Sequence, residues 1–176
     1  MKICMYQNVM NQQSNLTHHF PDNPQPKEKR MGSLVEVLKD PTVRPLVVAD
    51  CEKMLDAEIS DKKGLSGIAV KGAFKTLKAI KPGMIRHTFD DLLDELAEKV
   101  DPFWQDCLSQ KANPRTFFVS NSAAIANALL EITDGRIKRS KFKNIIRAYS
   151  TLRPKAIQYI GDAMPRFADL VSKYAS

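Results

Sequence analysis

The chain has 176 residues, of which 43% are hydrophobic and 27% are charged, and its formal net charge is +7. This length suffices for one domain with a substantial core, and the composition is ordinary for a globular protein. No apolar run approaches the roughly 20 residues that a membrane-spanning helix needs, and only seven glycines with few β-branched runs argue against an all-β fold.

The amino terminus lacks the apolar central region of a secretory signal. Three cysteines, at positions 4, 51 and 107, form no Cys-x-x-Cys pair, so neither a disulfide framework nor a zinc site is indicated. We therefore expect a cytoplasmic protein without a metal or another cofactor.

Residues 1–30 differ from the rest of the chain. They are rich in asparagine, glutamine and proline and have no periodic apolar pattern. Such a composition buries too little apolar surface to offset chain entropy, so we expect a disordered tail. Translation starting at Met31 is an alternative, in which residues 1–30 are an extension that the native protein lacks.

From Ser33 onward, apolar residues recur at three- and four-residue spacing. This pattern predicts a single all-α domain over residues 31–176, a bundle of about six to eight helices. The clearest amphipathic helix covers residues 84–100, and Asp101-Pro102 is typical of the end of one helix and the start of the next.

Three further helices are predicted in the second half of the chain. One begins at Asn121 or Ser122 and ends at Asp134-Gly135. The next covers residues 141–150, with Phe142 and Tyr149 on its buried side. The last is long and kinked at Pro165.

The stretch DKKGLSGIAVKGAFKTLKAIKPG, residues 61–83, contains four glycines and many lysines. A P-loop is excluded because Ala73 and Phe74 stand where that motif requires Lys and then Ser or Thr. On a helical wheel the segment carries a lysine ridge on one side and a stripe of small residues on another: Ala69, Gly72, Thr76 and Ala79. The stripe predicts a central helix, buried on most sides, that a neighbouring backbone approaches closely.

Charges alternate in blocks along the chain. Residues 62–86 contain seven bases and no acids, residues 90–106 contain seven acids and one base, and residues 36–61 contain seven acids and three bases. The simplest interpretation is that helices with complementary charged faces pair with one another. The other interpretation is a basic surface for nucleic acid or anionic lipid.

Eight bases without an intervening acid occupy residues 136–155. Together with the ridge on the glycine-rich helix, they are the candidate sites for a nucleic acid, another anion or an acidic protein. The full set is Lys71, Lys75, Lys78, Arg136, Lys138, Arg139, Lys141, Lys143, Arg147, Arg153 and Lys155.

The chain has no motif for an enzyme. Outside residues 1–30 it has one histidine, His87, and no second histidine follows at helical spacing to complete a metal site with Asp91. We therefore assign no catalytic residue and no metal ligand.

Four segments resemble a family of small bacterial proteins that is known only as a domain of unknown function. They are DKKGLSGIAVKGAFKTLKAIKPG at 61–83, DPFW at 101–104, ALLEITDGR at 128–136 and AYSTLRPKA at 148–156. The resemblance covers residues 31–176. It implies a helical, cytoplasmic bacterial protein and no activity or ligand.

Three hypotheses for function remain open. The first is a non-enzymatic binding module whose basic surface contacts a nucleic acid or an acidic protein. The second is a binder of a hydrophobic small molecule, or a small enzyme, with its pocket beside the helix at 65–80. The third is a structural homo-oligomer formed through an apolar face of the C-terminal helix.

Overall fold

The computed structural model describes residues 32–80 and 83–175. The expected tail at 1–30 and the alternative start at Met31 lie outside this range. The described residues form helices and no strands, which confirms the all-α prediction. The helices are α1 Leu34–Val37, α2 Arg44–Asp61, α3 Gly64–Ile80, α4 Met84–Ser109, α5 Pro114–Ser120, α6 Ser122–Lys138, α7 Lys143–Leu152, the short 3₁₀ helix η1 Arg153–Lys155, and α8 Ala156–Ala175.

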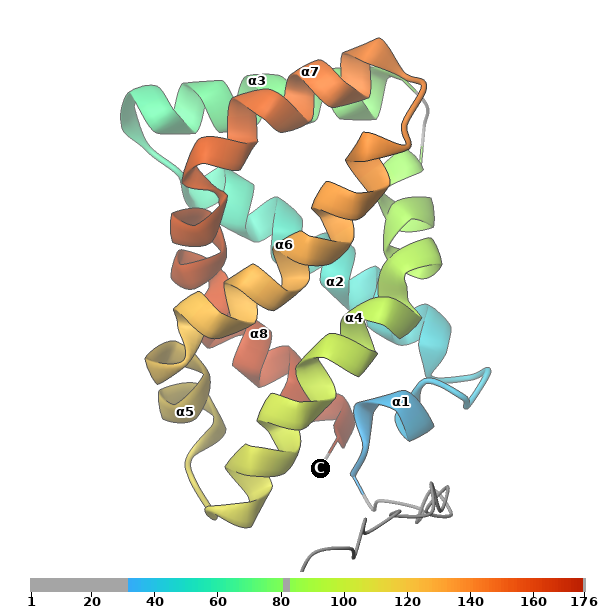
Figure 1. Cartoon of the computed structure of the whole chain (residues 1–176), viewed down its shortest axis with the longest axis vertical. Coiled ribbons are helices and arrows are strands. Elements are labelled where there is room, and N and C mark those ends of the chain that lie inside the picture. Colours follow the sequence, from blue (N-terminus) through green and yellow to red (C-terminus); the bar gives the residue numbers. More distant parts are fainter. Residues whose placement is uncertain (1–31, 81–82, 176) are drawn as a thin grey trace, which may run out of the picture.

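The helices form a body and a cap (Figure 1). In the body, α4 packs on α1, α2 and α6, and α8 packs on α5, α6 and α2. Helices α3 and α7 lie side by side and antiparallel across one end of the molecule's long axis. We call this two-helix layer the cap.

The half of the body farther from the cap is densely packed. Its largest fully buried side chains are Trp104, Phe118, Ile125 and Met164. The rings of Trp104 and Phe118 meet edge to face with centroids 6.5 Å apart, an arrangement that aromatic pairs favour. The Trp104 indole nitrogen also donates a hydrogen bond of 2.8 Å to the Gly32 carbonyl oxygen, which fixes the start of the domain against this core.

Asp101-Pro102 does not end a helix, contrary to the prediction. Helix α4 continues through Pro102, and Asp101 is a buried residue with another function. Its carboxylate accepts hydrogen bonds from the Leu34 backbone N–H at 2.8 Å and from the Ser33 hydroxyl at 3.3 Å. Asp101 therefore caps the first turn of α1 from a distant part of the chain, where an unpaired N–H would be costly.

The other helix boundaries are close to those predicted. Helix α6 continues through Gly135 to Lys138, because Gly135 does not adopt the left-handed conformation that would end the helix; among the described glycines that conformation is found at positions 32, 64 and 83. The C-terminal segment is one helix with Pro165 inside it, as expected.

The prediction that residues 65–80 form a central helix was wrong. Helix α3 is part of the cap and has one inward face, where Val70 and Ala73 are buried. The small-residue stripe is exposed at all four positions. A Cβ added at Gly72 would meet no atom within 4 Å, so no neighbouring backbone requires glycine there.

We predict that Asp101→Ala lowers the free energy of unfolding by about 1–3 kcal/mol, because the buried Leu34 N–H loses its acceptor. Chemical denaturation followed by the fluorescence of Trp104, the single tryptophan, measures this. Asp106→Ala, at an exposed position of the same helix, is the control. Equal destabilisation by the two variants would contradict the capping function of Asp101.

Candidate functional site

A partly open cavity of about 820 Å³ extends from α1 through the body to the cap. Protein interiors are close-packed and contain few voids larger than a water molecule, whereas pockets for small ligands measure roughly 300–1,000 Å³. The volume is therefore that of a ligand pocket and far exceeds that of a packing defect.

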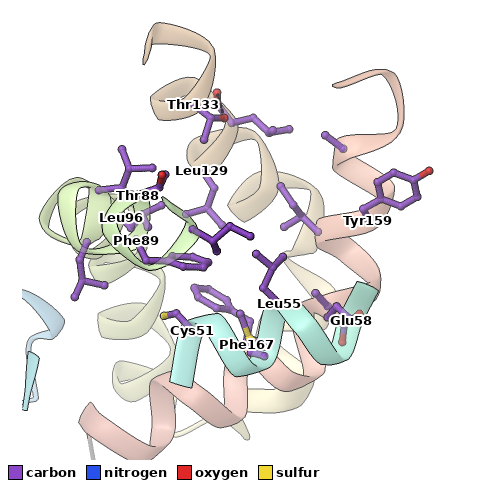
Figure 2. A pocket seen from close by; sticks show the side chains of 18 of the residues that line it. Cys51, Leu55, Glu58, Thr88, Phe89, Leu96, Leu129, Thr133, Tyr159 and Phe167 are labelled. Atoms are coloured by element: carbon purple, nitrogen blue, oxygen red, sulfur yellow. Dashed lines mark hydrogen bonds between the residues drawn. The ribbon is translucent and has the colours of Figure 1, made fainter. Parts of the chain in front are cut away.

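The cavity is lined by apolar side chains from α2, α4, α6 and α8 (Figure 2). Leu55 on α2, Phe89 on α4, Leu129 on α6 and Phe167 on α8 point towards one another across it. These side chains occupy inward positions of their helices, yet they are only partly buried. The helices that pack closely around Trp104 therefore diverge towards the cap and leave a hollow.

The cap closes the end of this hollow with further apolar side chains. Val70, Phe74 and Leu77 on α3 and Ile145 and Leu152 on α7 line the cavity. The inner face of the cap is thus continuous with the apolar wall, and the small stripe on α3, which faces solvent, is not part of it.

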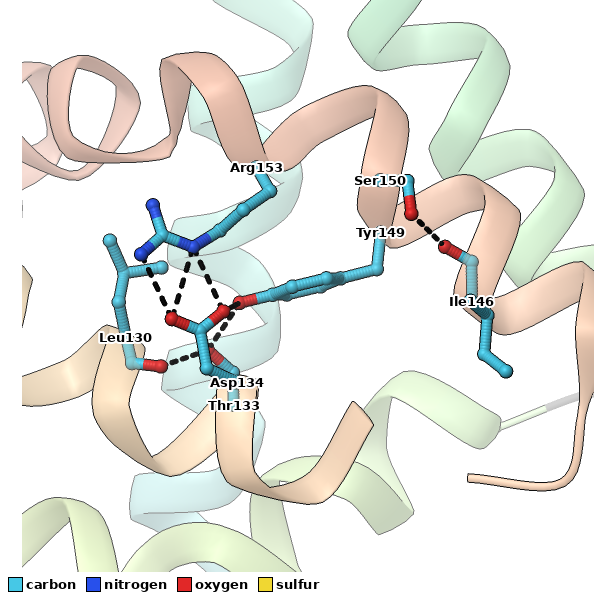
Figure 3. A network of polar contacts seen from close by, with 7 residues as sticks. All are labelled: Leu130, Thr133, Asp134, Ile146, Tyr149, Ser150 and Arg153. Atoms are coloured by element: carbon cyan, nitrogen blue, oxygen red, sulfur yellow. Dashed lines mark hydrogen bonds and ion pairs between the residues drawn. The ribbon is translucent and has the colours of Figure 1, made fainter. Parts of the chain in front are cut away.

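Polar groups line the cavity close to the cap. Asp134 on α6 accepts hydrogen bonds from the Tyr149 hydroxyl at 2.6 Å and from two nitrogens of the Arg153 guanidinium at 2.8 and 2.9 Å (Figure 3). The Thr133 hydroxyl lies 3.0 Å from the Tyr149 oxygen. We call Asp134, Tyr149 and Arg153 the latch, because they join α7 and η1 to the body.

The latch has a defined electrostatic state. The Arg153 guanidinium, and then the Tyr149 hydroxyl, hold the pKa of Asp134 below its ordinary value. Burial, followed by the neighbouring carboxylate, raises the pKa of Tyr149. At neutral pH the latch therefore consists of a carboxylate, a neutral phenol and a guanidinium, and Tyr149 presents its ring to the cavity.

Candidate catalytic groups are not gathered at the cavity. Cys51 lines it, but burial raises the pKa of this thiol to about 12, so it stays protonated and unreactive. His87 is exposed on α4. No group of three or more His, Cys, Asp or Glu side chains able to hold a metal occurs within residues 32–80 and 83–175.

The cap end of the molecule contains all of the basic candidates predicted from sequence. Three of the eleven form ion pairs with the body: Lys78 with Asp56, Arg136 with Glu95 and Arg153 with Asp134. Within the described part of the chain, the other eight basic residues form no ion pair. These are Lys71, Lys75, Lys138, Arg139, Lys141, Lys143, Arg147 and Lys155.

Complementary pairing of the charge blocks is realised mainly within the body. Arg166 on α8 binds Glu58 and Asp61 on α2, and Lys173 binds Asp50. Phe142, which was predicted to be buried, is 66% exposed, because α7 begins at Lys143, two residues after the predicted start, and leaves Phe142 at the N-cap.

We predict that Asp134→Asn lowers the melting temperature by a few degrees at neutral pH, because two partners lose their acceptor. When folding lowers the pKa of a carboxyl group, that group stabilises the fold at pH values above its pKa in the unfolded state. The contribution disappears as the pH falls through its pKa in the folded state. The difference between wild type and variant should therefore be full near pH 7 and shrink below the ordinary Asp value of 3.8.

Circular dichroism melts across this pH range measure the difference. Asp169→Asn is the control, since it removes one exposed ion pair with Arg115, a kind that contributes little. A wild-type advantage that is independent of pH would contradict the ionised latch.

None of the described helices is both long enough and apolar enough to cross a membrane. Neither the curated proteins nor the solved structures include a match to this chain. One family model matches residues 34–175, nearly the whole described domain. The chain therefore belongs to a family of unknown function, DUF6918.

Proposed function

We propose that this protein binds an elongated apolar small molecule, such as the acyl chain of a fatty acid, in the cavity that extends from the body to the cap. The observation that carries the proposal is a partly open cavity of about 820 Å³ whose wall is almost wholly apolar. Burying apolar surface is the main source of affinity for such ligands, at about 0.8 kcal/mol for each methylene removed from water.

The distribution of polar groups favours a ligand with one polar end. Thr133, Tyr149 and Arg153 contact the cavity near the cap. Leucine and phenylalanine side chains make up much of the remaining wall, which also includes Cys51 and Glu58 (Figure 2). An acyl chain placed along the body would keep its carboxylate near Thr133, Tyr149 and Arg153. The Cys51 thiol in the wall is kept protonated by burial, which raises its pKa to about 12, so we favour binding or carriage over catalysis.

Ligand binding takes precedence over the hypothesis of an acidic partner for the basic surface. The volume of the cavity, its apolar wall and its polar end all favour an elongated apolar ligand with one polar group. The basic residues support a class of partner through their charge, and those of α3 and α7, such as Lys71, Lys75, Lys143 and Arg147, are exposed. The two functions are compatible, since they use opposite faces of the same helices.

We predict that saturated fatty acids from octanoate to stearate displace a dansylated undecanoate probe from the full chain. Each added methylene should tighten Kd by roughly fourfold until the cavity is filled, because each transfers one further CH₂ out of water. Displacement titrations followed by dansyl fluorescence measure this. Affinity that is independent of chain length, or no binding of any member of the series, would overturn the proposal.

We further predict that filling the cavity abolishes binding and preserves the fold. Leu55→Phe combined with Leu129→Trp places aromatic rings where these two side chains face each other (Figure 2). The melting temperature should stay the same or rise, since the added atoms occupy empty space. Leu46→Phe, at a position on α2 that is 57% exposed, is the control and should bind as wild type does.

A further inference from the structure

We propose that the outer face of the cap docks on an anionic lipid bilayer. This inference goes beyond the proposed ligand binding and does not depend on it, because it concerns the opposite face of α3 and α7. It rests on three features of that face: exposed aliphatic side chains, exposed bases, and a complete lack of acids in the segments that form it.

Helix α3 is apolar on its outer face as well as its inner one. Leu65 is 87% exposed and Ile68 is 70% exposed, and the small residues Ala69, Gly72 and Ala79 are exposed with them. No described segment covers this face. A helix that is apolar nearly all round is normally buried, and a continuous exposed apolar face usually marks an interaction site.

The large aliphatic side chains of this face are concentrated near one end of the cap. Leu65 and Ile68 lie in the first turns of α3, which is 17 residues long, or about 25 Å at 1.5 Å per residue. Because α7 runs antiparallel to α3 (Figure 1), Phe142 at the start of α7 lies at the opposite end of the cap. Phe142 is 66% exposed, but it also lines the cavity, so the apolar part of the outer face is that of α3.

Exposed bases lie on the same two helices of the cap. Residues 62–89 contain seven Lys or Arg and no acid, and residues 135–161 contain eight and no acid. Lys71 and Lys75 on α3 and Lys143 and Arg147 on α7 are exposed. Because neither α3 nor α7 contains an acid, the described cap presents a surface of one sign that is complementary to anionic headgroups.

The chemistry of the exposed side chains favours lipid over nucleic acid. Apolar side chains flanked by lysine and arginine are typical of helices that lie in the membrane interface, where the aliphatic groups enter the acyl region and the bases stay among the headgroups. Single-stranded nucleic acids are bound on aromatic platforms. Phe142 is the one aromatic residue among the strongly exposed large hydrophobic side chains of the described cap.

Vesicle flotation with the full chain tests the proposal. Vesicles of phosphatidylcholine alone are compared with vesicles containing about one third phosphatidylserine, at ionic strengths of ~0.01 M and ~0.15 M, where the screening length falls from about 30 to 8 Å. We expect binding to the anionic vesicles alone, weakened at the higher ionic strength. Binding to both compositions alike, or to neither at low salt, would overturn the proposal.

Two variants locate the surface. Leu65→Ser with Ile68→Ser should lower the partition coefficient by about tenfold or more, since each methylene removed from the bilayer costs roughly fourfold. Lys71→Glu with Lys75→Glu should remove the preference for phosphatidylserine. The matched controls are Leu108→Ser, at a 42% exposed apolar position on α4, and Lys39→Glu with Lys111→Glu, at exposed sites away from the cap; both should partition as wild type does.

Each alternative occupant of the face gives its own result. Sedimentation velocity that shows a dimer which Leu65→Ser with Ile68→Ser dissociates would assign the face to a second copy of the chain. Duplex DNA or RNA that competes with vesicles and binds more tightly would assign it to nucleic acid. Either result, or an equal loss of binding in the controls, would overturn bilayer docking. Melting temperatures of all variants show whether the fold is retained, and changes at exposed positions should leave it intact.

Discussion

The packing of Trp104 against Phe118 is the contact on which the rest of the structure depends. It joins α4 to α5, and the Phe118 ring in turn contacts Phe167 on α8, with centroids 6.0 Å apart. Close packing is concentrated at this end of the body, where the largest fully buried side chains gather. A domain that gains its stability at one end can leave space at the other, because burial there is sufficient to offset chain entropy.

This division of the molecule explains why the cap is held differently from the body. The body helices meet through large apolar side chains, whereas the buried apolar side chains of α3 and α7 are smaller ones: Val70, Ala73 and Ala148. Polar contacts supply the remaining attachment: the latch on α7 and η1, and the ion pair between Lys78 and Asp56 on α3. Exposed ion pairs contribute little individually, so the partly buried latch is the principal polar link between cap and body.

The sequence predicted the helical class and most helix positions because amphipathic spacing is a local property. It did not predict which face of residues 65–80 would be buried, because that segment is apolar on both faces and the wheel distinguishes only the lysine ridge. It also missed the capping of α1 by Asp101, since Ser33 and Asp101 are 68 residues apart and Asp-Pro is ordinarily a local helix-start signal. The cavity left no signal in the sequence, because an inward-facing leucine has the same spacing whether it meets a neighbour or an empty space.

The charge pattern along the sequence predicted that ion pairs form, but it did not predict which bases would stay unpaired. The alternating blocks predicted that acidic and basic helices pair with each other, and such pairs form in the body. Carboxylates of α2 accept hydrogen bonds from Arg166 and Lys173 on α8, and Asp90 and Asp94 bind Arg44. Several of the acids that neighbour the basic blocks in sequence are therefore already paired in the body. The bases at the cap end have few remaining partners within the described chain. A surface left with one sign of charge weakens the compact state through self-repulsion. This cost is reduced when a surface of opposite charge is present. The inner face of α3 lines the cavity, and we propose that its outer face meets such a surface.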